Sequence, residues 1–176
     1  DPNVFATLGA DNKGVAYKMN GLDEKALKLF DQAIDAQLDI APVYFARGLL
    51  RREMGDYEGA IEDYSSMNTF DSVYFDAIYN RAFTYEMVGD FENALADANS
   101  AIELNPDDAH AWKLRGNIHL LFGDYGEAVI DYTQALKLDG EMTEALFSRG
   151  LAKVLNYRLK DGCQDMKLAR EMGYSG

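Results

Sequence analysis

The chain has 176 residues, of which 48% are hydrophobic, and a formal net charge of −13 at pH 7. This charge argues against nucleic acid as a partner, because phosphate binding needs clustered Lys and Arg, and it equally disfavours anionic membrane surfaces. No apolar run is long enough for a membrane-spanning helix, so we expect no direct membrane insertion.

Apolar residues recur at spacings of three, four and seven along the chain, which indicates amphipathic helices. Asp1-Pro2 fits an N-cap followed by proline at the first helical position, and Pro106 with Asp107 and Asp108 fits a helix stop and the next start. In chain order, the pattern predicts helices over residues 3–20, 23–37, 41–54, 57–69, 75–88, 91–104, 108–122, 125–138, 142–156 and 159–172.

A glycine recurs every 34 residues, at Gly21, Gly55, Gly89 and Gly123, and Tyr157 takes the next position. Each of these positions separates two helical faces, so the repeated unit is a helical hairpin. A fixed period of this length indicates stacked copies of one small unit, and such a stack presents an extended concave surface. This architecture favours binding or scaffolding over catalysis.

The pattern closely resembles the tetratricopeptide repeat (TPR) family, in the style of its bacterial members. In the fourth unit the family's signature positions are filled by Trp112, Gly116, Gly123, Tyr125, Ala128, Tyr132 and Ala135. The resemblance implies an all-α solenoid of five helix-turn-helix repeats that forms a single domain over 1–176. The expected repeats are about 7–40, 41–74, 75–108, 109–142 and 143–176.

In this family the first helix of each hairpin lines the inner, concave face. The resemblance therefore implies a protein-interaction module that binds a peptide or helix of a partner protein in this groove. The residues expected to contact the ligand are Phe45, Leu49, Tyr79, Phe83, Met87, Lys113, Asn117, Phe147 and Leu151. The alternative is a structural module that self-associates into a homo-oligomer without a peptide ligand.

Lys113 and Asn117 match two positions of the family's clamp for the C-terminal carboxylates of heat-shock chaperones. Ser148 stands where that clamp has an asparagine, and no later repeat supplies its other basic residues. We therefore do not expect a receptor for chaperone tails.

The sequence shows no pattern that predicts catalysis. His110 and His119 are nine residues apart on one predicted helix, a spacing that does not place them on one face. There is no metal-ligand spacing, phosphate-binding loop or nucleophile motif, so we expect no enzyme activity, no metal and no cofactor. The single cysteine, Cys163, falls at an apolar helical position, and we expect it to be buried.

An arginine recurs at a position that the TPR family commonly fills with leucine, and an aspartate follows it after sixteen residues. The expected pairs are Arg47–Asp63, Arg81–Asp97, Arg115–Asp131 and Arg149–Asp165. Because buried charges need partners, we predict a ladder of Arg–Asp pairs along the stack.

The second helix of the fifth unit differs from the helices before it. Gln164, Lys167 and Arg170 replace apolar or neutral residues and should be exposed, as on a terminal repeat. The residues expected to form one inward apolar stripe are Leu159, Cys163, Met166 and Ala169. The sequence leaves open the partner, the pathway, the oligomeric state and whether residues precede Asp1 or follow Gly176. It is equally compatible with a cytoplasmic protein and with an exported one whose targeting segment has been removed.

Overall fold

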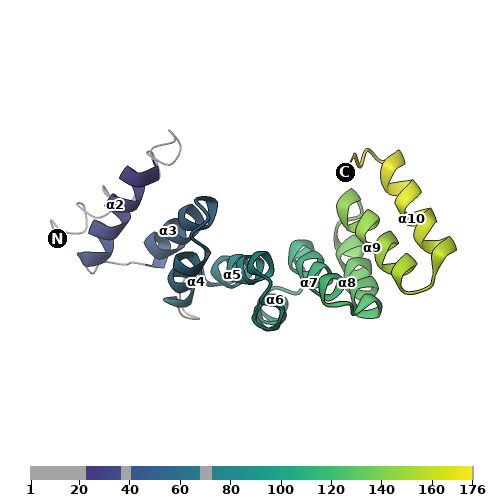
Figure 1. The fold of residues 1–176 in the computed structure, drawn as a ribbon, viewed down its shortest axis with the longest axis horizontal. Helices are drawn as coiled ribbons and strands as arrows, with labels where there is room; N and C mark the ends of the chain where they lie inside the picture. Colours follow the sequence, from purple (N-terminus) through teal and green to yellow (C-terminus); the bar gives the residue numbers. More distant parts are fainter. Residues whose placement is uncertain (1–22, 37–40, 68–72, 176) are drawn as a thin grey trace. The chain divides into compact units, whose positions relative to one another are not determined.

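The computed structural model describes residues 23–36, 41–67 and 73–175. The predicted first helix (3–20) and its Asp1-Pro2 cap lie outside these residues. Within them the chain is all-helical, and no helix there is long and apolar enough to cross a membrane (Figure 1). The helices are α2 (Asp23–Asp35), α3 (Ala41–Glu53), α4 (Tyr57–Ser65), α5 (Tyr74–Val88), α6 (Phe91–Leu104), α7 (Ala109–Phe122), α8 (Tyr125–Leu138), α9 (Thr143–Leu155) and α10 (Leu159–Glu171).

Helix α4 ends at Ser65, earlier than the predicted residue 69, whereas the other described helices begin and end within two residues of their predicted bounds. The hydroxyls of Ser65 and Ser66 donate to the carbonyls of Ile61 and Glu62, at 2.6 and 3.0 Å. Serine hydroxyls that bond back to the preceding turn weaken and bend a helix.

The chain forms two compact units, 1–84 and 85–176, whose boundary falls within α5. In unit 1, α2 packs on α3 and α3 packs on α4. In unit 2, α6 packs on α7, α7 packs on α8, α8 packs on α9 and α9 packs on α10. Sequential pairing of this kind is typical of a repeat array in which each unit touches its neighbours.

The turn between the helices of a hairpin is built by a glycine and the aspartate that follows it. Gly55, Gly89 and Gly123 have φ angles of 85°, 79° and 95°, a left-handed conformation that L side chains rarely adopt. Asp56 then caps α4 by accepting a hydrogen bond from the Gly59 N–H at 3.0 Å. Asp90 caps α6 in the same way, by accepting from the Asn93 N–H at 3.2 Å, whereas the Asp124 side chain makes no cap bond to α8.

Close packing of the two helices depends on small residues opposite tyrosine rings. A Cβ added to Gly48 would lie 2.7 Å from the ring of Tyr64, and one added to Gly116 would lie 3.0 Å from the ring of Tyr132. Both tyrosines are almost completely buried. This pairing of a small residue with a tyrosine ring is present within both units.

Helix α10 corrects part of the predicted inward stripe. Cys163 is exposed and Leu159 is 63% exposed, so the expectation that they are buried is wrong. Val129, one repeat before Cys163, packs against the unit 2 core beside α9. This position is only half-buried even at Val129, and none of the described residues follows α10 as a helix to cover Cys163. The residues predicted to be exposed on this helix, Gln164, Lys167 and Arg170, are exposed.

Candidate functional site

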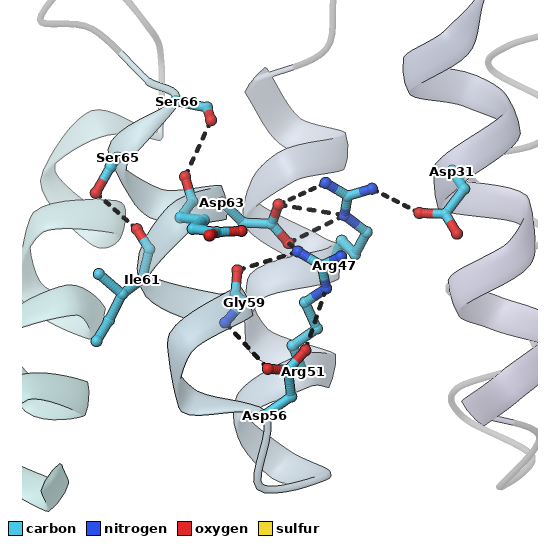
Figure 2. A network of polar contacts seen from close by, with 10 residues as sticks. Asp31, Arg47, Arg51, Asp56, Gly59, Ile61, Asp63, Ser65 and Ser66 are labelled. Atoms are coloured by element: carbon cyan, nitrogen blue, oxygen red, sulfur yellow. Dashed lines mark hydrogen bonds and ion pairs between the residues drawn. The ribbon is translucent and has the colours of Figure 1, made fainter.

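The predicted Arg–Asp ladder is present in the structure. Arg115 donates from Nε and Nη2 to the two carboxylate oxygens of Asp131, at 2.8 and 2.7 Å, and Arg149 holds Asp165 in the same way at 2.7 and 3.0 Å. In unit 1, Arg47 binds Asp63 with the same two nitrogens (Figure 2). These three pairs are confirmed. The fourth expected pair has one residue in each unit and stays a prediction.

Each of these aspartates also faces a second cationic or titratable side chain, which the sequence analysis missed. The Arg51 guanidinium lies 3.1 Å from Asp63, His119 Nε2 lies 3.8 Å from Asp131, and Lys153 Nζ lies 2.7 Å from Asp165. The second residue always follows the ladder arginine by four positions, so it is one helical turn away. Each carboxylate is therefore held between two side chains of one first helix.

The ladder arginines also reach back to the preceding repeat. Arg81 donates to Ser65 at 2.9 Å, Arg115 donates to Asn99 at 2.7 Å, and Arg149 donates to Thr133 at 3.4 Å. Arg47 likewise pairs with Asp31 on α2, as Figure 2 shows. The acceptor always lies sixteen residues before the arginine. Each arginine thus joins its own hairpin to the hairpin before it.

Burial sets the electrostatics of the ladder. Desolvation raises the pKa of Asp63, and the hydrogen bond and charge of Arg47 and the charge of Arg51 only partly oppose it. Desolvation would also raise the pKa of Asp165, but its hydrogen bonds from Arg149 and Lys153 outweigh that effect and lower the pKa. A charge held this way inside a helix pair stabilises one register of packing, so we assign the ladder a structural role.

In unit 1 the proposed ligand contacts differ in exposure. Phe45 and Leu49 are partly buried and pack against the core around Tyr64, with the rings of Phe45 and Tyr64 6.1 Å apart. Phe83 is 36% exposed, and the guanidinium of Arg52 lies 5.2 Å from its ring centroid. Tyr79 stacks on Phe75. Phe83 is thus the most accessible of the four predicted contacts on this unit.

In unit 2 the apolar contacts Met87 and Leu151 are 48% and 38% exposed. Phe147 is partly covered, because the ring of Tyr174 stacks on it with centroids 4.5 Å apart. A residue after α10 therefore occupies part of the surface that the sequence assigned to a ligand. Leu121 and Leu155, at 57% and 41%, are also exposed on first helices and extend this apolar surface.

The polar contacts of unit 2 belong to a cluster that joins four helices. Lys113 on α7 binds Glu144 on α9, with 2.6 Å between Nζ and Oε2. The Tyr132 hydroxyl on α8 donates to Asn117 Oδ1 at 2.8 Å. Glu86 on α5 has a buried Oε2 without a hydrogen-bond partner. The predicted contacts Lys113 and Asn117 thus lie in one cluster, and Glu86 and Glu144 are members that site prediction missed.

Desolvation raises the pKa of Glu86 to about 7. The charge of Lys113 lowers this pKa in part, and the charge of Glu144 raises it further. Its slot holds Arg52 in the preceding repeat and Leu120 in the following one, so the repeat pattern offered no signal for a carboxylate there. Across the described residues, no group of His, Cys, Asp and Glu is arranged to hold a metal ion.

The paired helices, turn glycines and arginine ladder define a helical repeat protein. Residues 41–66 and 85–142 match the tetratricopeptide repeat family. These two segments therefore contain tetratricopeptide repeats, and the helices of the described residues have the TPR fold, which is generally a protein-interaction module. Among curated proteins, none matches the sequence significantly.

Solved structures share this fold at low sequence identity. MamA 41-end from Desulfovibrio magneticus RS-1 is 17% identical, with a TM-score of 0.87 and 94% of each chain covered. A second MamA structure is 20% identical, with a TM-score of 0.84 over 90% of this chain and 93% of that one. YrrB, described as a TPR protein with an unusual peptide-binding site, is 18% identical, with a TM-score of 0.78 over 93% of this chain and 84% of that one.

Proposed function

We propose that the protein is a scaffold that binds a peptide or helix of a partner protein on the inner face of its first helices. The observation that carries the proposal is the exposure of large apolar side chains on these helices. Phe83 in unit 1 is exposed, and Met87 and Leu151 are exposed in unit 2. Large apolar side chains that are exposed within each unit are candidates for an interaction site.

The family and the structural neighbours support the same proposal. TPR proteins bind protein partners, and the YrrB structure is described by its peptide-binding site. In this chain, the partly buried Phe45 and Leu49 join the inner face to the core around Tyr64. Tyr79, Phe83 and Met87 provide side chains that contact the ligand. Lys113 and Asn117 orient the polar groups of the ligand, and Phe147 and Leu151 extend the surface in unit 2.

Capture of a partner from the native host, identified by mass spectrometry and repeated with the purified partner, tests the proposal. Phe83→Ala should weaken binding by about 2 kcal/mol, because aromatic anchors dominate such interfaces. The matched control is Ile130→Ala, which truncates a 58% exposed side chain on the second helix α8. Circular dichroism checks that both variants fold. Equal capture by Phe83→Ala and the wild type, or an equal loss in Ile130→Ala, would contradict the proposal.

A further inference from the structure

The inner face of unit 2 has an apolar part at the C-terminal ends of the first helices. Its members are Met87, Leu121 and Leu155, which recur every 34 residues, together with Leu151. They are 48%, 57%, 41% and 38% exposed. These side chains lie on α5, α7 and α9, the first helices of three successive repeats. We call these four residues the leucine row.

The polar cluster borders the leucine row and has an unbalanced charge. It contains the carboxylates of Glu86 and Glu144 but a single ammonium group, that of Lys113. Lys113 Nζ lies 2.6 Å from Glu144 and acts on Glu86 only through its charge. Glu86 keeps a buried oxygen without a hydrogen-bond partner, which is costly for a carboxylate. When both glutamates are ionised, one negative charge is left uncompensated.

The spacing of the two parts fits a helix. Lys113 and Leu121 are separated by eight residues of α7, or about 12 Å along the helix axis. An α-helix with its side chains is about 10–12 Å wide, so its two sides can contact both parts at once. On α5 the two parts are adjacent, because Glu86 and Met87 are consecutive residues, so an amphipathic ligand helix would there meet a carboxylate next to an apolar side chain.

We propose that this face binds a cationic amphipathic helix of the partner protein, whose apolar side covers the leucine row and whose Lys or Arg pairs with Glu86. The inference rests on the proposed function and names the chemistry of its ligand. Charge complementarity supports it locally, through Glu86 and Glu144, and globally, through the net charge of −13. A cation beside Glu86 would balance the charge of the cluster.

Two synthetic helical peptides test the inference by fluorescence anisotropy. They share one leucine side, and their other side carries either Lys or Glu. We expect the Lys peptide to bind the wild type more tightly than the Glu peptide does. Glu86→Gln should weaken binding of the Lys peptide about tenfold, and Leu121→Ser should weaken binding of both peptides. Glu127→Gln is the matched control, because it removes the same charge from an exposed position on α8 and should leave binding unchanged.

The pH supplies a second readout, since the charges facing Glu86 are those of Lys113 and Glu144, with the Tyr132 hydroxyl also close. Lys-peptide binding by the wild type should strengthen as the pH rises from 6 to 8, and this gain should vanish in Glu86→Gln. Equal binding of the two peptides, or equal losses in Glu86→Gln and Glu127→Gln, would overturn the inference and leave the binding function in place. Binding of neither peptide also overturns it, and partner capture then tests the proposed function separately.

Discussion

Tyr64 and Tyr132 occupy the same position two repeats apart, yet their hydroxyl groups differ. Tyr132 donates to Asn117, whereas the Tyr64 hydroxyl is buried without a partner. The residue that corresponds to Asn117 beside Tyr64 is Leu49, which offers no acceptor. Desolvation raises the pKa of both tyrosines above the ordinary range, so the pKa shift does not depend on this hydrogen bond.

This difference predicts opposite effects of one substitution. Tyr132→Phe removes a hydrogen bond and leaves Asn117 unpaired, so it should lower the free energy of unfolding by about 1 kcal/mol. Tyr64→Phe removes an unsatisfied buried hydroxyl and should raise that free energy by up to about 1 kcal/mol. Urea unfolding measures both. Equal losses in the two variants would show that Tyr64 has a partner in solution.

Glu86 predicts a pH-dependent stability. Its pKa is raised from 4.5 to about 7, so the folded state binds this proton more tightly than the unfolded state does. The contribution of Glu86 to stability therefore falls as the pH rises from about 4.5 to 7 and stays level above that range. Glu86→Gln cannot ionise, so its midpoint of thermal unfolding should exceed that of the wild type at pH 8 but not at pH 4. A constant difference at both pH values would exclude an ionisation of Glu86.

Residue-level partners were the least predictable part of the site. Lys113 and Asn117 were expected to face a ligand, but both already bind within the protein, to Glu144 and Tyr132. The repeat pattern could not predict these bonds because each lies at a position where the residue changes from repeat to repeat. Such contacts depend on side-chain conformation and on the particular neighbours of one repeat.

At the scale of helices, the sequence predicted nearly all of the features that recur with the 34-residue period. The Arg–Asp pairs were predictable because both members recur together. Their second partners were not, because Arg51, His119 and Lys153 are chemically different residues at one position, which is filled in the third repeat by Tyr85. The burial of Cys163 was wrongly predicted for another reason. The same position is only half-buried at Val129, where α9 follows, and it is exposed at Cys163.

The ladder predicts that its two kinds of bond differ in strength. Asp131 is 1% exposed and holds Arg115 through two bonds, so Asp131→Ala leaves a partly buried charge unpaired and should cost about 3 kcal/mol. Asn99→Ala removes one exposed bond from the same arginine and should cost less than about 1 kcal/mol. Urea unfolding compares the variants. A larger loss in Asn99→Ala would mean that the bond between repeats, and not the buried pair, fixes the register.

At the scale of the whole chain, a 34-residue period was enough to predict the class of fold, because each repeat meets the same kind of neighbour. The period does not distinguish a scaffold that binds a ligand from one that binds its own copies. Both would use exposed apolar residues such as Leu121 and Leu155, and both would be helical repeat arrays. The net charge of the chain distinguishes ligand binding from self-association. Two identical negatively charged chains repel each other, whereas a cationic ligand is attracted.

A net charge of −13 should therefore keep the protein monomeric. We expect sedimentation to give the mass of one chain over about two decades of concentration, in low salt and in about 1 M salt, where the screening length falls to about 3 Å. A dimer that forms only in high salt would show that apolar surfaces pair once repulsion is screened. If Leu121→Ser then restored the monomer, the leucine row would be a self-association surface, and the structural alternative would replace ligand binding as the function of this face.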